Sequence, residues 1–103
     1  MSNNSNVNIP KEIDSVNVTT IAPQAFAYSQ NIETITLPDT INGVGAYAFS
    51  ECNSLKKVVF SDNDVTIGKD IFSNSPNAVI CAPNDSYAQK YAAANNIVFE
   101  GIN

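Results

Sequence analysis

Hydrophobic positions recur along the chain at a fixed spacing. Two series of large apolar residues repeat at one common interval, which is about 23 residues. The first is Ile21, Val44 and Ile67, and the second is Phe26, Phe49 and Phe72. Three copies at one period are typical of a protein that stacks a single structural unit. The pattern therefore predicts a repeat array.

Each repeat also contains a short alternating segment that predicts a β-strand. The segments Ile32–Leu37 and Leu55–Phe60 have apolar residues in the same places. Successive strand residues face opposite sides, so Val58 and Phe60 are expected to point inward and their neighbours outward. One coil cannot bury this row alone. Stacked parallel strands would bury it against the row of phenylalanines. The segment 46–52 between strands is too short for an α-helix and predicts one helical or 3₁₀ turn.

The two ends of the chain depart from the repeat. Val7–Ile9 and Val16–Ile21 predict short strands, with a polar turn at Lys11–Asp14 between them, in a longer first coil. Near the other end, Ser86 and Gln89 form a capping box before an alanine-rich helix, and a final strand follows. A helix and strand placed there would cover the last coil.

These patterns predict a disordered polar tail over residues 1–6 and one domain over residues 7–102. The domain divides into an atypical first coil, two regular repeats, and a terminal strand with its cap. The corresponding ranges are 7–31, 32–54, 55–77 and 78–102.

The run from Leu37 to Leu55 resembles the BspA-type bacterial leucine-rich repeats, whose period is about 23 residues. The lead-in at Ile9–Asp14 and the ending from Ser86 to Phe99 are similar to those of the same family. The resemblance implies a leucine-rich-repeat solenoid of the α/β horseshoe class, mostly β. It implies a right-handed coil of about three to four parallel-stranded repeats with short helical turns and a capping helix plus strand. It also implies a binding surface, since members are often surface or secreted proteins linked to adhesion.

Charge and composition narrow the range of partners. The chain has five lysines, no arginine or histidine, and a formal net charge of −5. This argues against nucleic acid as a partner, because phosphate binding requires clustered basic residues. No apolar run approaches the roughly 20 residues that span a bilayer, so membrane insertion is not expected. Residues 1–6 do not resemble a signal peptide. A secreted or cell-surface location is expected only if the chain belongs to a longer exported protein, and the compartment stays open.

No pattern in the chain predicts an enzyme or a cofactor. Cys52 and Cys81 have no histidine to serve as a base. Cys52 occupies the slot of Ser29 and Ser75, which favours a small packed residue over a disulfide. Gly43–Gly45 belongs to a repeat slot and lacks the rest of a phosphate-binding motif. Asp62 and Asp64 supply too few oxygens for a calcium site by themselves, and whether they bind a cation is left open.

The outward strand positions are the candidate partner-binding residues. They lie on the open face of the sheet, which solenoids commonly use for ligands. The set is Glu33, Thr34, Thr36, Lys56, Lys57 and Val59. The sequence thus predicts a non-catalytic module that binds a protein or glycan. An alternative for Glu33 and Lys56 is a simple exposed ion pair one coil apart. The alternative function is a structural segment of a larger array, whose N-terminal coil is available for end-to-end self-association.

Overall fold

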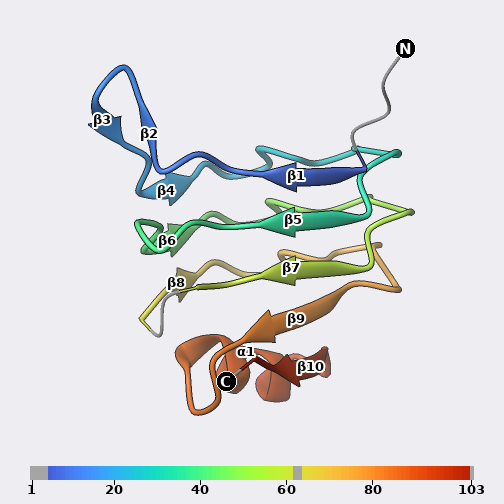
Figure 1. The fold of residues 1–103 in the computed structure, drawn as a ribbon. Helices are drawn as coiled ribbons and strands as arrows, with labels where there is room; N and C mark the ends of the chain where they lie inside the picture. Colours follow the sequence, from blue (N-terminus) through green and yellow to red (C-terminus); the bar gives the residue numbers. More distant parts are fainter. Residues whose placement is uncertain (1–4, 62–63, 103) are drawn as a thin grey trace.

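The computed structural model describes residues 5–61 and 64–102, and it shows a solenoid of stacked coils closed at one end by a helix and a strand (Figure 1). The elements follow in chain order: β1 (Asn6–Asn8), β2 (Glu12–Ile13), β3 (Val16–Asn17), β4 (Thr20–Ile21), β5 (Thr34–Thr36), β6 (Gly43–Val44), β7 (Lys57–Val59), β8 (Thr66–Ile67), β9 (Val79–Ala82), α1 (Tyr87–Ala94) and β10 (Val98–Gly101). The predicted solenoid of parallel strands is confirmed.

The strands form two parallel sheets on different sides of the coils. The larger has five strands in the order β1-β5-β7-β9-β10, and the smaller has three in the order β4-β6-β8. Ile35 lies beside Val58, so the period of the sequence becomes a contact between coils. Val7 lies beside Ile35, and the chain between these two residues is longer than the chain between Ile35 and Val58. The first coil is therefore longer than the next, as the sequence predicted.

The core lies between the sheets and is built from the predicted rows. Val58 and Phe60 point inward and have no exposed surface, and Ala78 and Ile80 continue the buried row in the last coil. The phenylalanine rings form a column, with centroids 5.9 Å apart from Phe26 to Phe49 and 6.0 Å apart from Phe49 to Phe72. Phe49, in the middle, is completely buried.

The corners between strands are consecutive β-turns, so the predicted helical or 3₁₀ turns are wrong. Ser29 N–H donates to the Phe26 carbonyl, and Ser75 N–H donates to the Phe72 carbonyl. Two residues in each coil have positive φ, at the same repeat positions. They are Gln24, Tyr47 and Asp70 in one series and Tyr28, Glu51 and Asn74 in the other. A left-handed residue in third place is typical of a type II turn, and it interrupts any helix.

The extra length of the first coil forms a hairpin, which the sequence did not predict. The polar turn expected at Lys11–Asp14 is wrong, because Glu12–Ile13 pairs with Val16–Asn17 as antiparallel strands. Asp14 and Ser15 connect them with φ values of 52° and 67°, as a type I′ hairpin turn requires. The hairpin projects beyond the first coil (Figure 1).

Of the tail expected over residues 1–6, the structure describes residues 5 and 6, and these two are bound to the next coil. Asn6 belongs to β1, and the Ser5 carbonyl accepts hydrogen bonds from the N–H groups of Glu33 and Thr34. These backbone bonds to the next coil order the two residues despite their polar side chains.

Helix α1 and strand β10 cover the last coil, as the sequence predicted. The Ser86 side chain accepts a hydrogen bond from Gln89 N–H and caps the helix. Ala88 and Ala92 are buried against the coil, and β10 extends the large sheet by pairing with β9. Within residues 5–61 and 64–102, no helix has the length and apolar character needed to cross a membrane.

Candidate interaction surfaces

The outer face of the five-stranded sheet carries two columns of side chains. The strand register places one residue from each strand in each column. The first column is Asn6, Thr34, Lys57, Val79 and Val98, and the second is Asn8, Thr36, Val59, Cys81 and Glu100. The first column changes along the stack from asparagine and threonine to valine. The second ends in the buried Cys81 thiol and the Glu100 carboxylate, so only the first column becomes more apolar toward the cap.

Four of the six predicted site residues lie on this sheet face. Thr34, Thr36, Lys57 and Val59 occupy neighbouring places in the two columns, and all four are half-buried. Their backbones are fixed in the ladder, so the side chains form a preorganised surface.

Glu33 and Lys56 lie just before β5 and β7 rather than within them. Lys56 Nζ is 3.7 Å from Glu33 Oε1, and the two side chains are 70% and 46% exposed. Such an exposed pair contributes at most about 1 kcal/mol to stability. The ion pair that the sequence offered as the alternative interpretation of these two residues is present.

Val79 and Val98 are part of the sheet face but were missed by the sequence interpretation. Val98 is the first residue of the edge strand β10 and is 66% exposed. The last coil departs from the period of the earlier coils, since Val58 lies beside Ile80, one residue short of a full repeat. The inward positions Ala78 and Ile80 were the available signal, because they require Val79 to point outward.

Neither cysteine is placed for nucleophilic chemistry. Both are free thiols, and each is 1% exposed. Burial, together with the nearby Glu100 carboxylate, raises the pKa of Cys81 to about 11, and its Sγ lies 3.3 Å from Glu100 Oε1. Burial also raises the pKa of Cys52. Because the thiolate is the reactive form, both groups are inert near neutral pH.

Cys52 and Ser75 play one structural role in successive coils. The Cys52 thiol donates to the Phe26 carbonyl at 3.2 Å, and the Ser75 hydroxyl donates to the Phe49 carbonyl at 2.6 Å. The predicted small-residue slot therefore also needs a hydrogen-bond donor, because these carbonyls are covered by the next coil.

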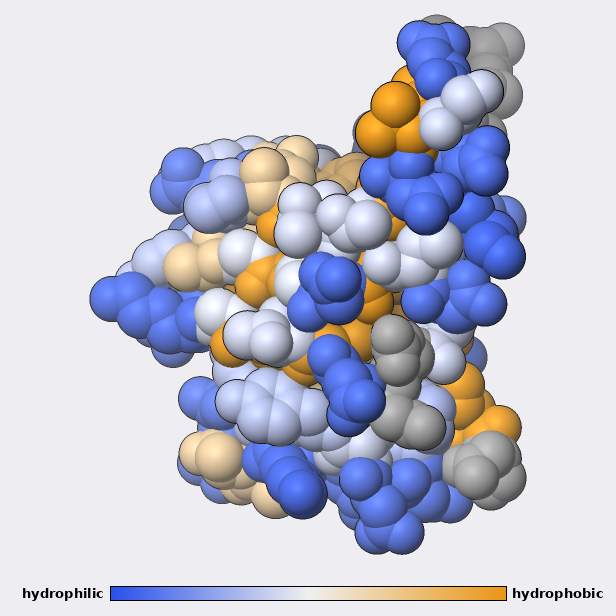
Figure 2. Space-filling model, turned by 90° about the vertical axis from the view of Figure 1, so that its left-hand side faces the viewer, coloured by the Kyte–Doolittle hydropathy of each residue, from blue (hydrophilic) through white to orange (hydrophobic). Residues whose placement is uncertain are grey.

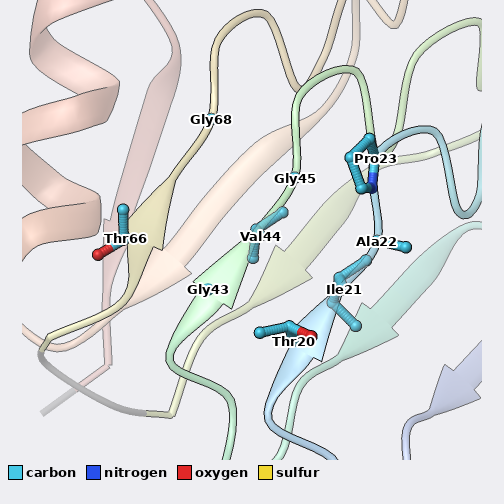
Figure 3. Close-up of a pocket in the computed structure, with 9 residues that line it drawn as sticks. All are labelled: Thr20, Ile21, Ala22, Pro23, Gly43, Val44, Gly45, Thr66 and Gly68. Atoms are coloured by element: carbon cyan, nitrogen blue, oxygen red, sulfur yellow. The ribbon is translucent and has the colours of Figure 1, made fainter.

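The three-stranded sheet carries a shallow, mostly apolar groove of about 470 Å³ (Figure 3). Its outward positions are threonine, glycine or alanine, and both outward positions of the middle coil are glycines. They form two columns: Thr20, Gly43 and Thr66, then Ala22, Gly45 and Gly68. Figure 2 looks at this side of the coils, where pale and hydrophobic residues lie in the middle and hydrophilic residues surround them.

Gly45 and Gly68 are present because neighbouring coils approach closely, not because of their backbone angles. Neither has positive φ. A Cβ on Gly45 would lie 2.4 Å from Pro23 N, and one on Gly68 would lie 2.6 Å from Ala46 N. Gly45 N–H donates to the Ile21 carbonyl at 2.7 Å. The groove therefore cannot offer this amide to a phosphate, which agrees with the repeat-slot interpretation.

The described residues include no group of three or more acidic, cysteine or histidine side chains that could hold a metal ion. Asp62 lies outside the described residues, so the candidate pair Asp62 and Asp64 is not tested by the structure.

The comparisons with known proteins identify the family through the repeats. Residues 1–96 match the family model described as "BspA type Leucine rich repeat region (6 copies)". No curated protein matches the chain. No solved structure matches it either. The matched region includes all the stacked coils, their strand register and the column of phenylalanines. The chain therefore belongs to the BspA-type leucine-rich-repeat family, whose members are typically non-enzymatic repeat proteins that act through interactions.

Proposed function

We propose that the protein is a non-catalytic module that binds a protein or glycan through the sheet face. Adhesion at a bacterial cell surface is the setting that this proposal implies. The proposal rests mainly on one observation: the sheet face is continuous over five strands and is not covered by another described element. An uncovered face of fixed geometry is where solenoids present their ligand contacts.

The chemistry of the sheet face supports this choice over the groove on the small sheet. Val59, Val79 and Val98 form an apolar stripe beside the Lys57 ammonium and the Thr34 and Thr36 hydroxyls. Apolar contacts flanked by polar groups are the usual composition of an interaction surface. The groove offers fewer contacts, since its floor is glycine and its Gly45 amide is engaged in the ladder.

Matched substitutions can test the sheet face. Val98 is 66% exposed and Val16, on the hairpin, is 67% exposed. Val98→Asp and Val16→Asp therefore make the same change at equal exposure, one on the sheet face and one away from it. Lys57→Glu and Lys11→Glu form a second pair with equal change of charge.

The measurement is binding to immobilised matrix proteins and to a glycan array, with melting curves as the check on folding. We expect Val98→Asp and Lys57→Glu to weaken binding of any captured partner at least about tenfold, with little effect from the hairpin variants. Equal binding by the face variants and the wild type would contradict the proposal.

A second candidate, a structural segment of a larger array, is favoured by the open edge of the first coil. Among the described strands, β1 pairs with β5 alone. In a parallel sheet alternate residues bond to opposite neighbours, so the backbone groups of Asn6 and Asn8 face the open edge. Sedimentation over a concentration series tests end-to-end association through this edge. A monomer at every concentration would count against it.

A further inference from the structure

A second hollow lies between α1 and the coil that contains β8, away from the sheet face. It has a volume of about 480 Å³. We call it the helix groove, and its lining includes Ile67, Lys69, Tyr87, Lys90, Tyr91 and Ala94. The C-terminal helix lies beside the loop at Gly68 (Figure 3), where the Tyr91 hydroxyl donates a hydrogen bond to the Gly68 carbonyl. None of these residues belongs to the two columns of the sheet face.

The helix groove gathers two lysines whose charge is not neutralised by an ion pair. Lys11 lies 3.3 Å from Asp39, and Lys56 lies 3.7 Å from Glu33. Across residues 5–61 and 64–102, Lys69 and Lys90 form no such pair with a carboxylate. In a protein of net charge −5, two lysines that line one hollow and have no ion-pair partner among the described residues give that hollow a local excess of basic side chains. Such a site attracts an anion.

One of these lysines is held near an aromatic ring. Lys69 Nζ lies 5.9 Å from the centroid of the Tyr47 ring, which favours a cation–π contact. Asp70, the nearest carboxylate in sequence, lines a neighbouring hollow that shares Tyr91 with the helix groove, and its negative charge acts on the Tyr91 hydroxyl. Lys69 lines the helix groove and is exposed, whereas Tyr47 does not line it, so the ammonium of Lys69 lies toward the outer edge of the groove.

The floor of the helix groove is a fixed aromatic surface. The Tyr91 hydroxyl donates to the Gly68 carbonyl at 2.8 Å and accepts from Ile71 N–H at 3.4 Å. Burial raises the pKa of Tyr91, so the hydroxyl stays neutral and keeps both bonds. Tyr87, one helical turn earlier, is 49% exposed. The groove therefore combines a rigid ring, an exposed ring and two cations.

We infer that the helix groove binds the carboxylate-bearing sugar units of an acidic polysaccharide. The face of an aromatic ring is electron-rich and accepts the C–H groups of a sugar ring, while the two ammonium groups bind the carboxylate. An acidic peptide fits less well. It cannot add to β8 as a further strand, because the Tyr91 hydroxyl already occupies the Gly68 carbonyl and the Ile71 N–H in the corner that follows β8.

The test is calorimetric titration of the full chain with an oligomer of galacturonic acid. The methyl-esterified oligomer is the matched neutral ligand, and a poly-glutamate peptide represents the acidic-peptide class. The groove variants are Tyr87→Ala and the double variant Lys69→Gln/Lys90→Gln. The control is Lys11→Gln, which removes the charge of a lysine already in an ion pair and is compared with the single groove variant Lys90→Gln.

We expect the galacturonate oligomer to bind the wild type and the control, and to bind each groove variant at least about tenfold more weakly. The esterified oligomer should bind weakly to all. Equal binding of the two oligomers, equal losses in the control, preference for poly-glutamate, or no binding would each overturn the inference. The Val98→Asp variant should bind the oligomer normally, so failure here is separable from failure of the sheet-face proposal.

Discussion

The two ends of the solenoid differ in how the apolar residues of their last coils are covered. At the C-terminal end, α1 and β10 cover the last coil, and Ile80 and Ala82 beneath them have no exposed surface. At the N-terminal end, Val7 occupies a core position but remains only partly buried, and Phe26 is partly buried, as is Phe72 at the other end of the phenylalanine column. Since each coil buries its apolar row only against neighbours, the same type of residue contributes less at an open end than in the middle.

The first coil also differs in how it could accept a neighbour. Ala22 stands at the position of Gly45 and Gly68, where a Cβ points at the backbone of the preceding coil. A coil stacked on Ala22 with the spacing of the array would collide with this methyl group. The hairpin that carries Ile13 and Val16, 59% and 67% exposed, projects from the same end. The first coil therefore has backbone hydrogen-bonding groups at an open edge, but its shape does not allow another coil to stack on it with the regular spacing.

The largest expected effect comes from one substitution made at both places in the phenylalanine column. Phe49→Ala should lower the free energy of unfolding by about 3–5 kcal/mol, because it empties a completely buried site. Phe26→Ala should cost about half as much, since that ring is partly exposed. Denaturant unfolding measures both. A loss below about 1 kcal/mol for Phe49→Ala would mean that the column is not the core.

The contact between coils can be tested at the glycine positions. Gly45→Ala should destabilise by about 1–3 kcal/mol, because the new Cβ would lie 2.4 Å from Pro23 N. Ala22→Gly, the reverse change at the open end, should alter stability by less than about 1 kcal/mol. Thermal melting of the pair gives the comparison. Equal changes in stability at positions 22 and 45 would show that the close approach of neighbouring coils is not the reason for glycine at position 45.

The cap can be loosened with the removal of one atom. Tyr91→Phe deletes the hydroxyl that bridges the Gly68 carbonyl and Ile71 N–H, and we expect a loss of about 1–2 kcal/mol. Hydrogen exchange should then rise in α1 and the neighbouring corner, while exchange in β1 stays as in the wild type. Uniform exchange along the chain would contradict an independent role for the cap.

The smallest effect concerns the buried thiol beside β10. The folded state holds the Cys81 proton up to a pKa of about 11, against 9.0 for an unperturbed thiol. The unfolded state releases its proton first, so stability is full below pH 9 and falls as the pH rises toward 11. The loss from pH 8 to pH 10 is on the order of 1 kcal/mol. Cys81→Ser keeps a donor for Glu100 but does not titrate there, so its stability should fall less. The same dependence of stability on pH in the wild type and in Cys81→Ser would contradict the raised pKa of Cys81.

Much of the sheet face could be predicted from alternation alone. Thr34, Thr36, Lys57 and Val59 point outward because the strand period of two fixes their side once Ile35 and Val58 are inside. Glu33 and Lys56 could not be placed as securely, since they precede the strands, where the alternation does not yet apply. Val98 was not predicted as a sheet-face residue, because its strand belongs to the sheet through its pairing with β9, which the local sequence does not show.

The corners were the least predictable part of the fold. Gln24, Tyr28 and Glu51 have positive φ although their residue types do not favour it. The ladder between coils imposes these angles: Phe26 N–H donates to the Ala48 carbonyl and Tyr28 N–H to the Ser50 carbonyl. Hydrogen bonds to a neighbouring coil are not visible in the local sequence, which instead suggested a helical turn.

The sequence by itself determined the repeat, the family, the inward rows and the helical cap, because all of these depend on periodicity and local capping chemistry. The tertiary structure decided what the repeat leaves open. It turned the extra residues of the first coil into a hairpin and gave Gly45 its reason in the distance between coils. It also brought Lys69 and Lys90 to one groove. Most of these features depend on contacts between segments of different coils, and only the stacking of the coils creates those contacts.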